Sequence, residues 1–160
     1  NRVVQSVVRI VMERTERDGL ALDVKLDEHL PHVLADERMV RQMLLNLLSN
    51  ASKFTPEGGH IEVRSHTRED GGVELVVADT GVGIAEHDFE TVLAPFGQVE
   101  NPMSRKHSGT GLGLSLVKSM IELHGGKVEI ESVPGEGADM KLVFPAARVL
   151  GNDADGRAAE

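Results

Sequence analysis

The amino-acid sequence predicts an α+β sandwich in which helices cover one face of a mixed sheet. Three long segments, residues 3–17, 36–55 and 112–124, carry apolar side chains at helical spacing. Two pairs of strand-like segments, each pair joined by a glycine-containing turn, predict antiparallel hairpins. Because an amphipathic helix and a one-sided sheet each bury an apolar face, this combination favours two packed layers.

The N-terminal part of the chain is predicted to form a helix, a strand and a longer helix. Valines recur at helical spacing in residues 3–17, and Gly19 ends that pattern. Residues 20–26 alternate between apolar and polar side chains, which predicts a strand. Asp36 stands in the N-cap position of the second helix, which is expected to end near residues 55–59, at a proline and two glycines.

A hairpin, a short helix and a loop are expected next. Residues 60–67 and 73–79 predict two strands around a two-glycine turn. A short helix is expected within residues 84–93. Residues 95–108 have few apolar side chains and no clear period, so we expect a mobile loop there.

The C-terminal part predicts one more helix and a second hairpin. The helix is expected at residues 112–124, and two strands at 127–133 and 138–144 flank a turn of sequence PGEG. The polar residues 148–160 are expected to be a disordered tail. The sequence therefore predicts one domain, spanning residues 1–147.

The composition of the chain excludes several classes of function. The net charge of −9 argues against nucleic acid as a partner, because phosphate backbones are bound by clustered Lys and Arg. Without cysteine there is no disulfide or thiolate chemistry. No signal peptide or membrane-spanning apolar run is present. Since the chain does not begin with Met, we expect it to be a piece of a longer protein, which can be membrane-anchored elsewhere. We expect this piece itself to be soluble, monomeric and cytoplasmic.

The stretch RKHSGTGLGLSLVK places three glycines just before a predicted helix. It lacks the Gly-Lys-Ser/Thr of a Walker A loop, and no buried strand precedes it as in a dinucleotide-binding fingerprint. Free amides at a helix start nevertheless favour an anion, and Arg105 and Lys106 add positive charge. A flexible glycine-rich hinge explains the same pattern equally well.

Asn46, Asn50 and Lys53 share one stripe of the second predicted helix, at positions i, i+4 and i+7. Asn is a poor residue inside a helix, so two on one stripe call for a reason. An Asn carbonyl oxygen is a suitable ligand for Mg2+, and a Lys can contact a phosphate. Taken alone, the stripe is also explained as the polar flank of an amphipathic helix.

Asp79 ends a predicted strand and is followed by Gly81 and Gly83. A carboxylate at such a place can accept a hydrogen bond from a ligand amine, for example the amino group of adenine. The alternative is a turn in which Asp79 caps local amides. Three clusters with different chemistry, in this order, are hard to explain by structure alone.

The three clusters resemble the catalytic and ATP-binding domain of sensor histidine kinases. LLNLLSNASKFTPEGG is similar to the N box of that family, DTGVGI to its G1 box and GTGLGLSLVKSMIELHGG to its G2 box. The resemblance covers about residues 1–145. It implies the Bergerat fold, a two-layer α/β sandwich shared with the gyrase B subunit, and it implies ATP and Mg2+ as cofactors.

The resemblance also implies roles for individual residues. Asn50 would coordinate Mg2+, Asn46 would help to position the metal or the phosphates, and Lys53 would contact phosphate. Arg105 or Lys106 would lie near the γ-phosphate, within an ATP lid formed by residues 95–108. Adenine would be bound by Asp79, beside Phe54, Gly81, Gly83 and Ile84. The phosphates would be held by backbone amides of Gly109, Thr110, Gly111, Leu112 and Gly113.

The activity implied is transfer of the ATP γ-phosphoryl group to a histidine on a separate dimerisation domain of the same homodimeric kinase, with a response regulator downstream. ATP-hydrolysing members carry a Glu where this chain has Asn46, which cannot act as a general base. The chain has seven histidines, and we expect most of them to be surface residues. None of them stands in the context of the family's phosphoacceptor.

Three positions depart from the family pattern, namely Leu93, Ala94 and Ser108. None of them removes a ligand group, but they leave a second interpretation open. In that alternative the chain is a nucleotide-binding pseudokinase that signals by conformation without phosphotransfer. A serine kinase of the anti-sigma-factor type is a third interpretation.

Overall fold

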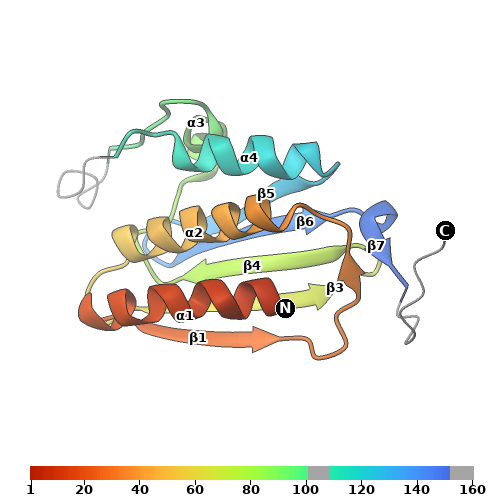
Figure 1. The fold of residues 1–160 in the computed structure, drawn as a ribbon. Helices are drawn as coiled ribbons and strands as arrows, with labels where there is room; N and C mark the ends of the chain where they lie inside the picture. Colours follow the sequence, from red (N-terminus) through yellow and green to blue (C-terminus); the bar gives the residue numbers. More distant parts are fainter. Residues whose placement is uncertain (101–108, 152–160) are drawn as a thin grey trace.

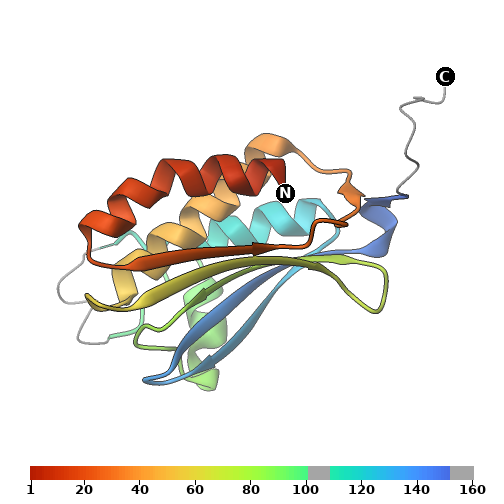
Figure 2. The same ribbon diagram turned by 90° about the horizontal axis from the view of Figure 1, so that it is seen from below.

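The computed structural model describes residues 1–100 and 109–151. Its main sheet has five strands in the order β1-β3-β4-β6-β5. The strands are β1 (Ala21–Leu26), β3 (His60–Thr67), β4 (Val73–Asp79), β5 (Lys127–Val133) and β6 (Gly137–Phe144). Three helices, α1 (Arg2–Arg17), α2 (Glu37–Phe54) and α4 (Gly113–Leu123), lie on one face of this sheet (Figures 1 and 2). The predicted α+β sandwich is confirmed.

The pairing of the strands makes the sheet mixed. β1 runs parallel to β3, with Ala21 opposite His60. The two predicted hairpins are present as the antiparallel pairs β3–β4 and β5–β6. β4 also pairs with β6, which places Asp79 opposite Ala138. β4 is therefore the central strand, and its C-terminal end lies inside the sheet rather than at an edge.

The core lies between the three helices and the inner face of the sheet. α2 is the middle helix, and its side chains Met43, Leu44 and Leu47 are almost fully buried. Val7 of α1 and Ile121 of α4 are also fully buried, so both flanking helices contribute to the same core. With very few aromatic residues, the chain builds this core almost entirely from aliphatic side chains.

Helix α2 begins and ends where the sequence predicts. The Asp36 side chain accepts hydrogen bonds from the amides of Arg38, at 2.8 Å, and Met39, at 3.0 Å. It therefore satisfies two of the amide groups that have no partner within the helix. Thr55 follows the last residue of α2 in an extended conformation, which ends the helix where the sequence predicts.

The segment before α4 contains less regular structure. The predicted short helix is present as a 3-10 turn, Glu86–Asp88, followed by α3 (Phe89–Leu93). Residues 94–100 form neither helix nor strand, as expected. The rest of the predicted loop, residues 101–108, lies outside the described residues. α4 begins at Gly113, one residue later than the sequence indicates. In the part of the chain that the structure describes, no helix is long and apolar enough to cross a membrane.

The prediction of a disordered tail from Arg148 is wrong for residues 148–151. Val149–Leu150 form a short strand, β7, which pairs antiparallel with another short strand, β2 (His32–Val33). The Leu34 amide donates to the Arg148 carbonyl at 2.7 Å, and Val149 packs against the core. Strands of two residues show no alternation of apolar and polar side chains, so no sequence pattern could predict this pairing. Residues 152–160 lie outside the described residues.

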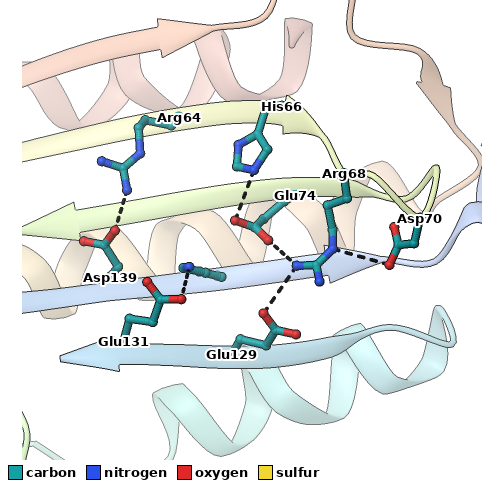
Figure 3. Close-up of polar contacts among 9 residues, drawn as sticks. Arg64, His66, Arg68, Asp70, Glu74, Glu129, Glu131 and Asp139 are labelled. Atoms are coloured by element: carbon teal, nitrogen blue, oxygen red, sulfur yellow. Dashed lines mark hydrogen bonds and ion pairs between the residues drawn. The ribbon is translucent and has the colours of Figure 1, made fainter.

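The outer face of the sheet is covered by paired charges rather than by helices (Figure 3). Glu74 is only 4% exposed. It contacts the Arg68 guanidinium on one side and lies 3.4 Å from His66 Nε2 on the other. Arg68 also reaches Glu129 on β5 at 3.3 Å. Arg68, which directly follows β3, therefore connects the two hairpins across this face through Glu74 on β4 and Glu129 on β5.

Substitution of the N-cap residue tests the local origin of α2. Asp36→Ala removes the acceptor for two helix amides, so we expect the free energy of unfolding to fall by about 1 kcal/mol. Asp36→Asn keeps the acceptor and serves as the control, with stability close to wild type. Urea denaturation measures both. Equal stability of all three proteins would show that the cap contributes nothing.

Candidate functional site

One cavity of about 970 Å³ lies between α2, the start of α4 and the ends of the central strands. All three sequence clusters meet in it. The predicted site residues that line it are Asn46, Asn50, Lys53, Phe54, Asp79, Gly83, Ile84, Gly109, Thr110, Gly111 and Gly113. A cavity of this size is typical of a small-molecule or cofactor site.

The polar stripe of α2 forms one wall of this cavity. Gln42 Nε2 donates to Asn46 Oδ1 at 3.0 Å, and Asn46 Nδ2 donates to the Gly113 carbonyl at 3.3 Å. Asn46 thus connects α2 to the first residue of α4. Asn50 stands one turn further along α2, and its Nδ2 would lie 3.9 Å from a Cβ placed on Gly113. The stripe therefore faces the glycine-rich helix start, rather than solvent alone.

Lys53 occupies the end of the stripe. Its Nζ would lie only 2.5 Å from a Cβ placed on Gly109, so the ammonium group occupies the space that a side chain at position 109 would need. The same Nζ lies 5.2 Å from the centre of the Phe54 ring, a favourable cation–π distance. The Lys53 charge is therefore held beside the backbone of Gly109.

Asp79 lies at the end of β4, on the face of the sheet that the helices cover. Burial raises the pKa of its carboxyl group from the ordinary value of 3.8 to about 6, although hydrogen bonds from the Gly81 and Ala138 amides act in the opposite direction. The Gly81 amide donates to Asp79 Oδ1 at 2.8 Å. The carboxylate is thus poorly solvated, and a ligand that donates a hydrogen bond to it would relieve that cost.

The positions of Gly81 and Gly83 leave no room for a side chain, because other parts of the backbone lie very close to them. A Cβ on Gly81 would lie 2.4 Å from the Phe54 carbonyl oxygen and 2.7 Å from Asp79 Oδ1. Gly83 has a positive φ of +68°, and its Cβ would lie 2.1 Å from the Val133 carbonyl oxygen. Gly81 does not itself line the cavity. Its part is to bring an amide to Asp79 and to join the loop to the end of α2.

The start of α4 has no side-chain cap in the part of the chain that the structure describes. Leu112, which precedes the helix, makes no capping hydrogen bond, so the first amides of α4 have no intrahelical partner. Gly111 has a φ of +69°, and its Cβ would lie 2.8 Å from the carbonyl carbon of Phe96. Thr110 is exposed and lines the cavity, whereas Leu112 does not line it. A helix start of this kind attracts anions.

Arg105, Lys106 and Ser108 lie outside the described residues. Phe54 and Ile84 are apolar residues of the cavity that the sequence predicted. The rest of the apolar wall was not predicted, and it includes Leu47, Val77, Val92, Leu114, Ala138 and Met140. Alternation along β4 and β6 could have indicated the strand residues, since they share the inner face with Asp79. Thr55 also lines the cavity, and its buried hydroxyl has no partner among the described residues.

The fold is a two-layer α/β sandwich with a cavity at one end of its central strands. Residues 35–148 match the family of histidine kinase-, DNA gyrase B-, and HSP90-like ATPases, and the chain belongs to this family. Within it, a relative named as a histidine kinase and the solved structures of two histidine kinases show that the chain is similar to histidine kinase catalytic domains.

Two relatives illustrate the sequence similarity. The chain is 47% identical over 146 residues to the non-motile and phage-resistance protein of Caulobacter vibrioides, covering 89% of this chain and 17% of that protein. It is 35% identical over 158 residues to the cell-division control histidine kinase PdhS of Brucella canis, covering 94% of this chain and 15% of that kinase. The chain thus spans less than a fifth of the length of these relatives.

Solved structures show the same fold. The catalytic domain of histidine kinase ThkA in a nucleotide-free form has a TM-score of 0.78 and 28% identity, with 91% of this chain and 93% of that chain covered. Full-length ShkA in complex with AMPPNP also has a TM-score of 0.78, with 31% identity, and covers 89% of this chain and 29% of that chain.

The partly buried Asp79 carboxylate predicts an unusual dependence of stability on pH. Because folding raises the pKa of Asp79 to about 6, the folded chain holds this proton more tightly than the unfolded chain. The associated stability is complete below about pH 4 and is lost as the pH rises through 6. In the absence of ligand, we therefore expect the free energy of unfolding of Asp79→Asn to rise relative to that of wild type as the pH increases from about 4 to above 6. The relative rise should be at most about 3 kcal/mol.

Thermal or urea unfolding of both proteins between pH 4 and pH 7.5 measures this difference. Glu131→Gln, an exposed carboxylate on β5, is the control and should show no such trend. A wild-type to Asp79→Asn difference that stays constant with pH would contradict a raised pKa at this site.

Proposed function

We propose that this chain binds ATP with Mg2+ and donates the γ-phosphoryl group to a histidine on a separate dimerisation domain of the same homodimeric kinase, upstream of a response regulator. One observation carries the proposal. A single cavity holds the partly buried Asp79 carboxylate, the stripe with Asn50 and Lys53, and the start of α4, which has no side-chain cap among the described residues. An adenine nucleotide needs a hydrogen-bond acceptor and an apolar wall for its base, and positive partners for its phosphates.

Asp79 and the apolar wall suit the base. Asp79 Oδ1 accepts a hydrogen bond from the Gly81 amide. Because a carboxylate can accept about four hydrogen bonds, Asp79 can also accept one from an exocyclic amine. Ile84 and Met140 line the cavity near this end and offer apolar surface to a planar ring. An amine that donates to Asp79 favours the charged carboxylate and lowers the cost of its burial.

The start of α4 and Lys53 suit the phosphates. The unpartnered amides at Gly113 and beyond point along the helix axis toward an anion, and the helix dipole adds to the attraction. Lys53 lies beside Gly109 and provides a full positive charge. In our proposal Arg105 and Lys106 add charge from the lid, and Lys53 and Arg105 stabilise the transferring group.

Asn50 is the proposed Mg2+ ligand. Among the described residues, no group of three His, Cys, Asp or Glu side chains could hold a metal. One neutral amide oxygen, with phosphate oxygens and water, matches the way Mg2+ is bound in phosphoryl-transfer sites. When bound, Mg2+ neutralises charge on the phosphates.

The chemistry that the chain supports is transfer rather than hydrolysis. Both amide atoms of Asn46 are engaged, by Gln42 and by the Gly113 carbonyl, and an amide cannot remove a proton from water. In the proposed step, a nitrogen lone pair of the acceptor histidine attacks the γ-phosphorus. A P–N bond forms while the P–O bond to the β-phosphate breaks, and ADP leaves. The chain contributes orientation and electrostatic stabilisation.

The phosphate end also carries exposed apolar side chains that suit a docking partner. Leu112 is 39% exposed and Leu116 is 49% exposed, and they stand one turn apart at the start of α4. Phe96 is 73% exposed, and its backbone contacts Gly111. An apolar surface beside the phosphates supports the docking of the dimerisation domain there.

Calorimetric titration with ATP, with and without Mg2+, tests the proposal. We expect binding that requires Mg2+ for full affinity and that Asp79→Asn weakens at least about tenfold, because a hydrogen bond to a charged group is lost. Glu131→Gln is again the matched control, with wild-type affinity. No binding by the folded wild-type chain at millimolar ATP would contradict the proposal.

Transfer is then measured with γ-labelled ATP and the dimerisation domain of the same kinase. Label on the acceptor histidine is the expected result. ATP binding without any transfer would favour the pseudokinase alternative instead.

A further inference from the structure

We propose that His124 is a positioning residue for the phosphate end of the site. Through one hydrogen bond to the backbone of Asp36, it fixes how α4 is aligned along α2. This inference rests on the proposed function, because the alignment of these helices determines how the start of α4 faces Asn50 and Lys53.

The His124 ring is buried and fully engaged. The residue is only 5% exposed, so it is an exception to our expectation that most of the histidines are surface residues. The Asp36 amide donates to His124 Nε2 at 3.0 Å. Since Nε2 must accept, Nδ1 carries the proton and donates to the Met120 carbonyl at 2.7 Å. The ring also packs edge-on against Phe144, with 5.9 Å between the ring centres.

The two hydrogen bonds of this ring differ in what they connect. The bond to Met120 lies within the last turn of α4, whereas the bond to Asp36 crosses to the N-cap of α2. Outside this joint, Arg148 reaches the carbonyls of Leu34 and Leu123, both at 3.5 Å. The C-terminal end of α4 is thus attached to the segment that leads into α2.

The other end of the same helix pair carries the phosphate site. α2 and α4 run antiparallel, so the Asn46 side chain meets Gly113 at the start of α4. That contact is 3.3 Å long, which is longer than the 3.0 Å bond at His124. We infer that the His124 joint is the fixed end of α4, and that the end at Gly113 adjusts when phosphates bind.

Loss of the joint should therefore affect phosphates more than the base. α4 is an 11-residue helix, short enough to move as one body. If its C-terminal end shifts, the amides at its start move relative to Asn50 and Lys53. Asp79 belongs to β4 and depends on Gly81 and Ala138, so the base end should keep its geometry.

Two substitutions separate the two bonds of the ring. In His124→Gln the amide oxygen reaches about as far as Nε2 and can accept from the Asp36 amide, but the bond to Met120 is lost. In His124→Asn the shorter side chain can still donate to the Met120 carbonyl, but it cannot reach Asp36. Amide hydrogen exchange at Asp36 verifies the difference, with protection expected in wild type and His124→Gln only.

The dissociation constants of Mg2+-ATP and of adenosine are measured for the three proteins, at a temperature where each is folded. We expect His124→Asn to weaken ATP binding about fivefold, a factor that corresponds to one net hydrogen bond. Adenosine binding should stay unchanged, and His124→Gln should bind ATP as wild type does.

Three results would overturn the inference. ATP affinity could be unchanged in His124→Asn, ATP and adenosine affinities could fall in parallel, or His124→Gln could lose as much as His124→Asn. The second of these would indicate general loosening of the domain. Failure of the proposed function is distinguished by the wild-type chain, which would then bind neither ligand.

Discussion

The antiparallel packing of α2 and α4 on one face of the sheet is the constraint on which the rest of the molecule depends. Both helices bury aliphatic faces against the same core, so neither can shift without exposing Leu47 or Ile121. This packing brings the polar stripe of α2 beside the uncapped start of α4. Asn46 and Gly113, which are 67 residues apart in the sequence, thereby line one cavity that has both polar walls and an apolar wall.

The cavity combines groups that are unfavourable without a ligand. Asp79 is a carboxylate whose burial raises its pKa, and within the described residues the first amides of α4 have no side-chain cap. Each of them leaves charge or partial charge poorly solvated. Natural domains tolerate such groups where a ligand completes them. The Asp79 carboxylate favours a hydrogen-bond donor, whereas the amides at the start of α4 favour negative charge. A ligand with a donor at one end and negative charge at the other suits both.

Local signals in the sequence predicted most of the elements, and long-range contacts account for what was missed. The Asp36 cap, the two hairpins and the Asn46–Lys53 stripe follow from neighbouring residues, so pattern and spacing were sufficient. The β2–β7 pair and the burial of His124 depend on partners about 90 or more residues away. The apolar wall of the cavity was missed for a similar reason, because residues such as Met140 look like ordinary core residues until the strands are aligned.

In the free chain the Asp79 carboxylate is poorly solvated, and a ligand amine that donates a hydrogen bond to it should stabilise its charged form. Titration of its side-chain carboxyl carbon by NMR, with and without saturating Mg2+-ADP, tests this directly. We predict a pKa of about 6 in the free chain and a clearly lower pKa in the complex, because the amine donor favours the charged carboxylate. A pKa near that of an ordinary Asp in the free chain, unchanged by the nucleotide, would contradict the account.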